Sequence, residues 1–194
     1  MNGVFAQEKN FTGLHCSGET FADCEWTDCT FVRCTFENCQ LQNCQLTDCT
    51  FTGCRVRELT ARYSQLREAV FDNCDLLGVN WGDLVPSGRF AAPIAALRGC
   101  RLKYNTFTAM ELDRFCFDES AITSSLFAEC RLAGSDLSGC QLDETEFFKC
   151  DLRRADLRRA VGYRVDIMSC QLKGARFTHP QVLSLLEALE IEVE

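Results

Sequence analysis

The chain has 194 residues, with 28 acidic and 20 basic side chains and a net charge of −8. This length suits one domain or one array of repeats, and an apolar content of 46% argues against disorder. The acidic balance argues against direct nucleic-acid binding, which needs a basic surface. No run of eighteen apolar residues occurs, so we expect no membrane partner.

The first ten residues are predicted to form an N-terminal cap, and residues 11–81 a first array of short repeats. From Phe21 a large apolar residue returns at every fifth position, as in Trp26, Phe31 and Phe36. Phe11 and Cys16 extend this register backwards less convincingly. A period of five fits neither a helix nor a single strand. Units this short must stack on copies of themselves, which predicts an all-β solenoid.

Most cysteines stand two positions before the large apolar residue, where Ala, Ser and Thr also occur; only Cys16 and Cys116 leave this register. A position that accepts all four residue types selects a small side chain, so we expect reduced thiols. The start of the chain lacks the features of a secretory signal, which favours a cytoplasmic protein. The cysteines are five residues apart and His15 and His179 lie near the two ends, so we expect no metal and no cofactor.

Residues 82–99 show no repeat and are predicted to interrupt the array as a loop. Pro93 is placed to begin a short helix from Ile94 to Arg98, with Gly99 just past its end. The repeat resumes in a second array, residues 100–177, whose inward positions run from Leu102 through Gly162 to Phe177.

Residues 178–194 differ from the repeat. Pro180 to Leu189 reads as a helix and Ile191 to Glu194 as a short strand. Two interpretations stay open: a cap that covers the last coil, or a homodimer contact at the C-terminus. The residues assigned to the dimer interface are Leu183, Leu185, Leu186, Leu189, Ile191 and Val193.

The unit seen in Ala155-Asp156-Leu157-Arg158-Arg159 resembles the repeat of the pentapeptide-repeat family, and this pattern covers about four-fifths of the chain. The resemblance implies a right-handed, quadrilateral parallel β-helix. In such a helix residues twenty apart should stack. Phe31, Phe51 and Phe71 fall in one such column, as do Cys34, Cys54 and Cys74.

Within that family the chain is similar to the topoisomerase-protecting branch of Qnr, MfpA, McbG and AlbG proteins. The similarity rests on the segment from Asp75 to Trp81, on Val165-Asp166-Ile167 and on the tail from Ala175 to Val193. It implies that an acidic rod mimics DNA, binds DNA gyrase or topoisomerase IV, and protects the enzyme from quinolones or peptide poisons. Many Qnr proteins have two projecting loops. The single interruption here is nearer the McbG and AlbG arrangement, which leaves gyrase binding plausible and puts quinolone protection in doubt.

The residues assigned to partner binding come from the interruption and from outward acidic positions, because carboxylates on rigid coils could meet the basic groove that holds DNA. They are Asp83, Pro86, Arg89, Phe90, Asp113, Asp118, Glu119, Asp143, Glu144 and Glu146. The alternative is a generic structural or adaptor solenoid whose acidic exterior serves only to keep it hydrated.

A basic strip, Arg153, Arg154, Arg158, Arg159 and Arg164, runs against the acidic pattern. We expect it to pair with Asp151, Asp156 and Asp166; the alternative is a role near the dimer junction. No GxSxG, HExxH or P-loop motif occurs, so we expect no enzyme activity. Cys116 is interpreted as a bystander without a catalytic base.

Overall fold

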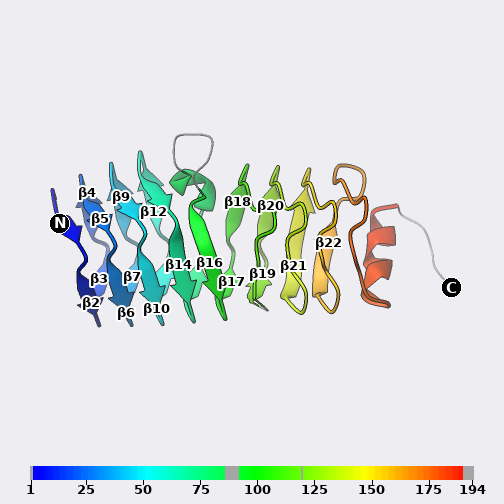
Figure 1. Cartoon of the computed structure of the whole chain (residues 1–194), viewed down its shortest axis with the longest axis horizontal. Coiled ribbons are helices and arrows are strands. Elements are labelled where there is room, and N and C mark those ends of the chain that lie inside the picture. Colours follow the sequence, from blue (N-terminus) through cyan, green and yellow to red (C-terminus); the bar gives the residue numbers. More distant parts are fainter. Residues whose placement is uncertain (1, 86–91, 119, 190–194) are drawn as a thin grey trace.

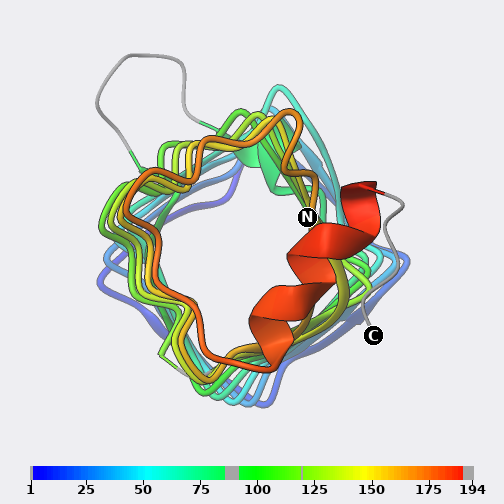
Figure 2. The same cartoon turned by 90° about the vertical axis from the view of Figure 1, so that its right-hand side faces the viewer.

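The chain folds as a rod of stacked coils in a computed structural model that describes residues 2–85, 92–118 and 120–189 (Figure 1). Each coil runs once around the four sides of the rod, and within each array neighbouring coils pair residues twenty apart, as Phe31 does with Phe51. The cross-section is roughly square (Figure 2). The predicted right-handed, four-sided parallel β-helix is therefore confirmed.

We number the four sides in chain order. Face 1 begins with β1 (Phe5–Gln7), β5 (Glu25–Thr27), β9 (Gln45–Thr47) and β13 (Gln65–Arg67). Face 2 holds β2 (Asn10–Thr12), β6 (Thr30–Val32), β10 (Thr50–Thr52), β14 (Ala69–Asp72) and β16 (Ile94–Arg98).

Face 3 is the longest ladder. It comprises β3 (His15–Ser17), β7 (Thr35–Glu37), β11 (Arg55–Arg57), β15 (Asp75–Leu77), β17 (Arg101–Lys103), β19 (Ala121–Thr123) and the start of β21 (Gln141–Phe148). Face 4 comprises β4 (Thr20–Ala22), β8 (Gln40–Gln42), β12 (Thr60–Arg62), the 3-10 helix η1 (Trp81–Leu84), β18 (Thr106–Thr108), β20 (Leu126–Ala128), the end of β21 and β22 (Val161–Val165).

In the second half, faces 1 and 2 continue as isolated bridges rather than strands. Face 1 continues through Glu111, Arg131, Asp151 and Gln171, and face 2 through Cys116, Asp136, Asp156 and Arg176. On faces 1 and 2 of the second half the chain makes a tight turn on either side of each bridge. Each coil therefore has one residue per face that pairs with the next coil.

The core consists of side chains stacked in columns along the rod. The rings of Phe31, Phe51 and Phe71 stack with centroids 4.8 and 4.9 Å apart, and Phe107 and Phe127 stack at 4.3 Å. These separations match the distance between paired strands, so parallel pairing and ring stacking reinforce each other. The columns predicted from the twenty-residue spacing are confirmed.

The repeat cysteines lie beside these columns, buried at the corners. The Cys54 Sγ–H donates to the carbonyl of Phe31 at 3.3 Å, and Cys44, Cys74 and Cys130 make the equivalent contact. Burial raises the pKa of the Cys49 thiol to about 11, which keeps it protonated near neutral pH. The corner position thus favours a small side chain with a weak donor.

Three predictions of the sequence analysis need correction. Residues 2–10 are not a distinct cap, because β1 already pairs with β5 as an ordinary first coil. Ile94–Arg98, inside the predicted interruption, is the strand β16 rather than a helix and continues face 2. Parallel pairing to β14, with a register shift between Ala69 and Val70, makes this segment a strand, although its buried residues Ile94 and Leu97 are three positions apart.

The third correction concerns Gly162, which the five-residue register placed inside. It is exposed, and Tyr163 and Val165 fill the core instead, because the register between β21 and β22 shifts after Gln141. Gly162 has a φ of +77°, and a Cβ there would lie 2.6 Å from the Cα of Asp143. Only glycine fits at this place.

The rod ends in the 3-10 helix η2 (Gln181–Leu189), which lies across the last coil (Figure 2). Leu185 packs against the core cluster, and η2 contacts β22. The predicted capping helix is confirmed, whereas the predicted strand from Ile191 to Glu194 lies outside the described residues.

Candidate protein-binding surface

The acidic residues predicted to bind a partner do not form one patch. Asp113 lies on face 1 and Asp118 at the corner after face 2, whereas Asp143, Glu144 and Glu146 belong to β21 at the corner of faces 3 and 4. Asp83 is exposed on η1. Pro86, Arg89, Phe90 and Glu119 lie outside the described residues, as do Ile191 and Val193.

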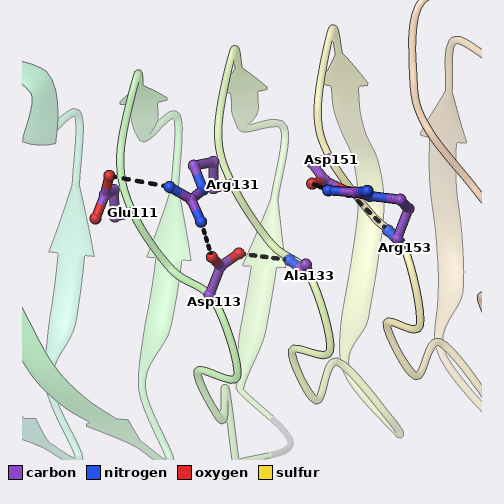
Figure 3. A network of polar contacts seen from close by, with 6 residues as sticks. All are labelled: Glu111, Asp113, Arg131, Ala133, Asp151 and Arg153. Carbon is purple, nitrogen blue, oxygen red and sulfur yellow. Dashed lines mark hydrogen bonds and ion pairs between the residues drawn. The ribbon is translucent and has the colours of Figure 1, made fainter.

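Several of these carboxylates bind neighbouring coils of the rod itself. Arg131 contacts Glu111 at 3.3 Å and Asp113 at 2.6 Å, and Asp113 also accepts a hydrogen bond from the backbone N–H of Ala133 at 2.9 Å (Figure 3). On β21, Ser124 donates to Glu144 at 3.0 Å and Arg164 lies 3.9 Å from Glu146. Carboxylates that brace adjacent coils in this way are less available to a partner.

Two arginines of the basic strip, Arg153 and Arg158, pair with aspartates as expected, whereas Arg164 lies near Glu146. The Nε–H of Arg153 donates to Asp151 at 2.8 Å, and that of Arg158 donates to Asp156 at 2.9 Å (the first pair is drawn in Figure 3). Asp166 differs from the expectation, because it accepts hydrogen bonds from Ser169 and from the backbone N–H of Met168 rather than from an arginine.

These pairs predict a pH-dependent contribution to stability. Hydrogen bonds from Arg153 and Arg158 lower the pKa values of Asp151 and Asp156 below the ordinary range. A carboxyl with a lowered pKa stabilises the fold above its unfolded pKa, and this is lost as the pH falls through the folded value. The double variant Asp151→Asn/Asp156→Asn should therefore be less stable than the parent at pH 6, and equally stable near pH 2.

Urea denaturation across this pH range measures the effect. We expect a loss below about 1 kcal/mol at pH 6, since both arginines are largely exposed and water screens the pairs. The exposed Asp48 has no ion pair in the described part of the chain, so Asp48→Asn is the control and should leave the pH profile unchanged. A double variant that keeps its deficit at pH 2 would contradict the electrostatic explanation.

The structure reveals an acidic column that the partner-binding assignment missed. Glu8, Asp28, Asp48 and Glu68 occupy the same corner, between faces 1 and 2, in four successive coils. All four are exposed, and all have φ between +50° and +53°, so each stands at an equivalent left-handed turn. We call Glu8, Asp28, Asp48 and Glu68 the acidic column.

No ion pair holds any of these four carboxylates within the described residues. Their spacing along the rod follows the strand separation of about 4.8 Å. The sequence does contain a signal for the acidic column, because its four members are spaced twenty residues apart, as are the stacked Phe and Cys residues.

Charge is distributed unequally between the two arrays. Residues 1–85 contain twelve acidic and six basic side chains, whereas residues 86–194 contain sixteen acidic and fourteen basic. The acidic character therefore belongs mainly to the N-terminal half, where the acidic column stands. The second array is cross-linked by ion pairs.

The predicted dimer residues differ in exposure. Leu183 and Leu189 are 41% and 43% exposed, which is high for leucine, whereas Leu186 is half-buried and Leu185 packs on the last coil. The helix η2 therefore closes the rod with one side and presents two leucines on another.

Two searches of the described residues gave no candidates. No helix among them is long and apolar enough to cross a membrane. No group of three or more His, Cys, Asp or Glu side chains in the same ranges is arranged to hold a metal ion. Cys116 is exposed on face 2, as expected of a bystander.

Comparison with family models gives two matches, the pentapeptide repeat region over residues 24–86 and pentapeptide repeats (8 copies) over residues 125–161. Together they span about half of the chain. A search of curated protein sequences found no match.

Solved structures share the fold. A trypsin-treated variant of QnrB1, described as a plasmid-mediated fluoroquinolone resistance protein, superposes with a TM-score of 0.62 at 18% identity, covering 95% of this chain and 99% of that one. A second trypsin-treated variant gives 0.61 at 22% identity, covering 100% and 99%. Full-length QnrB1 gives 0.51 at 20% identity, covering 94% and 100%.

Proposed function

The chain is a pentapeptide-repeat protein, and from that premise we propose that it binds DNA gyrase, or topoisomerase IV, in place of a DNA segment and protects the enzyme from a poison. The observation that carries this proposal is the acidic column, a file of exposed carboxylates held at equivalent turns of a rigid rod. The shared fold with QnrB1 along nearly the whole chain supports it.

The electrostatics favour partial mimicry of DNA. Duplex DNA carries about one charge per 1.7 Å of its axis, whereas the column offers one carboxylate per coil, about every 4.8 Å. Because the rod is rigid, little ordering cost opposes binding, but a sparser file of charges displaces fewer counterions. We therefore expect moderate affinity that falls as salt rises.

The contact surface proposed here differs from the sequence-based assignment. Asp113, Glu144 and Glu146 lie in the C-terminal half and contact side chains of adjacent coils. Asp28, Asp48 and Glu68 have no such partners in the described residues, so we place the main electrostatic contact on the N-terminal half. The assignment of partner-binding residues to the interruption remains a prediction.

The proposal is tested by gyrase supercoiling with and without this protein, at low and moderate salt, in the presence of a quinolone and separately of a peptide poison. Protection should appear with at least one poison and weaken as salt rises. Unchanged inhibition under every condition would remove gyrase protection as a function and leave the adaptor alternative.

We also propose that two copies join at their C-terminal ends through η2. Exposed Leu183 and Leu189 support this, because the last coil is already covered by Leu185 and its neighbours. In such a dimer the two N-terminal halves, which carry the acidic columns, would point away from each other.

The double variant Leu183→Asp/Leu189→Asp should convert this dimer into a monomer of 21.9 kDa, because charges cannot be buried unpaired in an apolar contact. Light scattering coupled to size exclusion measures the mass. Tyr63→Asp is the matched control, since Tyr63 is 92% exposed and lies far along the rod on face 4. A parent protein that is already monomeric would refute the interface.

A further inference from the structure

The ladder between neighbouring coils is broken on face 2 where the interruption returns to the rod. On face 3, β15, β17 and β19 pair without a gap. On face 2, β16 pairs with β14 on one side only, and the next coil at this face pairs forwards, through the bridge from Cys116 to Asp136. Within the described residues, no backbone hydrogen bond joins β16 to residues 113–118.

Main-chain groups on both sides of this break make no backbone hydrogen bond to any described residue. Elsewhere on face 2 the pattern is regular: the N–H of Val70 donates to the carbonyl of Cys49 at 3.0 Å, and that of Asn73 donates to Arg98 at 2.8 Å. One coil further on, the equivalent groups are the carbonyl of Ala95 with the N–H of Cys116, and the N–H of Gly99. In the part of the chain that the structure describes, none of these makes a backbone hydrogen bond. The open edge of the strand β16 therefore faces an unpaired N–H at the single bridge position Cys116.

A hollow of about 640 Å³ separates this edge from Cys116. Its walls include Ala95, Ala96 and Leu97 of β16 on one side and Phe115 and Cys116 on the other. We call this hollow between β16 and residues 113–118 the slot. Regular coils leave no such space, because their strands lie about 4.8 Å apart.

The charge around the slot is negative overall and continuous with the acidic column. Four carboxylates line it, those of Glu68, Glu111, Asp113 and Asp118, together with the guanidinium groups of Arg98 and Arg114. Arg131 contacts Glu111 and Asp113, so four negative groups stand against three positive ones, and Glu68 and Asp118 are the acidic groups without an ion pair in the described residues. Glu68 is also the last member of the acidic column, so an exposed line of carboxylates leads along the corner of the rod into the slot.

We propose that the slot binds an extended, basic segment of a partner protein, which adds as a strand between the open edge of β16 and Cys116. An extended backbone supplies alternating N–H and C=O groups that match the unpaired ones, as in strand addition to an exposed sheet edge. Lys or Arg side chains of the segment would lie against the acidic rim. The partner class is a polypeptide with a basic strand-forming stretch, and the proposal holds whether or not the protein acts on gyrase.

A synthetic probe tests this directly. Isotope-labelled full-length protein is titrated with the peptide acetyl-KVRVKVRV-amide, and backbone amide shifts are followed by NMR. Saturable shifts should concentrate at Gly99 and Cys116 and along β16. The same peptide with every second amide N-methylated keeps its charge and side chains but cannot pair as a strand, so it should bind at least tenfold more weakly.

Each possible result of this titration supports or overturns a part of the proposal. If the N-methylated peptide bound as tightly as the unmodified one, charge attraction alone would explain the contact, and strand addition would be overturned. If the acidic peptide acetyl-EVEVEVEV-amide bound as tightly as the basic one, the charge argument would be overturned. Shifts of the same amides with protein concentration alone would show that a second copy occupies the slot. Absence of shifts with any peptide would show that it is closed.

A variant of the protein supplies the reciprocal test. Cys116→Pro removes one unpaired N–H and should weaken the basic peptide at least tenfold, with circular dichroism to check the fold. Glu68→Gln/Asp118→Asn, which leaves the backbone unchanged, should weaken it about threefold. If both variants fold and bind the basic peptide as tightly as the parent protein does, the proposed pairing is contradicted. If Cys116→Pro does not fold, strand addition is tested by the N-methylated peptide and the charge argument by Glu68→Gln/Asp118→Asn.

Discussion

Neutralising the acidic column should raise the concentration of protein needed for half-maximal gyrase protection roughly tenfold. The triple variant Asp28→Asn/Asp48→Asn/Glu68→Gln removes three exposed charges that have no ion pair in the described residues. Exposed charge pairs contribute about 0.2–1 kcal/mol each, and about 1.4 kcal/mol corresponds to a factor of ten. The substitutions keep side-chain shape, and Asn tolerates the left-handed turn that Asp28 and Asp48 adopt.

The chain offers a closely matched control. Asp23, Glu58 and Glu129 are also acidic and also stand at left-handed turns, with φ of +53°, +50° and +56°, but they are not stacked in one column. Asp23→Asn/Glu58→Gln/Glu129→Gln removes the same net charge from scattered places. It should shift protection less than threefold. Equal losses in the two triple variants would mean that total charge, and not the column, governs binding.

The salt dependence of the two variants adds a second readout. Charges that contact the partner contribute to the fall in affinity with salt, because association then releases counterions. The column variant should therefore respond less steeply to salt than the parent, whereas the control should keep most of the parent's response. This separates a direct contact from a general effect on solubility.

The sequence could predict a solenoid because units of five residues must stack on copies of themselves to bury their apolar side chains. The four-sided coil was implied by the family resemblance, and the structure confirms it by placing the rings of Phe31, Phe51 and Phe71 less than 5 Å apart. The small residues at the corners, which recur with the same period, also indicate a solenoid. Periodic burial is a property of every coil, so it is readable without tertiary contacts.

The failures occurred where the period breaks. Pro93 followed by Ile94 and Leu97 satisfies the local rules for a helix start, but the open edge of β14 recruits this segment as a strand. Gly162 fell in the inward register, yet the shift between β21 and β22 moves Tyr163 inside. Long-range pairing overrides local preference at both places.

The candidate surface was harder to predict than the fold, because an outward carboxylate does not reveal whether its own chain uses it. Asp113 and Asp48 look alike in the sequence, but only Asp113 has an arginine 2.6 Å away. The broken ladder that forms the slot depends on which strands fail to pair. No property of Ala95 or Cys116 in the sequence shows that.

Truncating the middle of the second aromatic column should cause a large loss of stability. Phe127 is fully buried, stacks on Phe107 at 4.3 Å and on Phe147 at 4.9 Å, and meets Phe117 edge to face at 5.8 Å. Phe127→Ala would leave a cavity surrounded by rigid rings that cannot collapse into it. We expect a loss of about 3–5 kcal/mol in the free energy of unfolding, measured by urea denaturation.

Phe11→Ala is the matched comparison, because Phe11 is half-buried in the first aromatic column and stacks on one ring only, that of Phe31 at 4.9 Å. Partial burial of one aromatic side chain contributes about 1–1.5 kcal/mol, so Phe11→Ala should cost far less than Phe127→Ala. In a solenoid each coil contacts only its neighbours, so the end of the rod can loosen while the middle stays folded. Similar losses in the two variants would mean that the rod unfolds as one cooperative block and that position along the column does not matter.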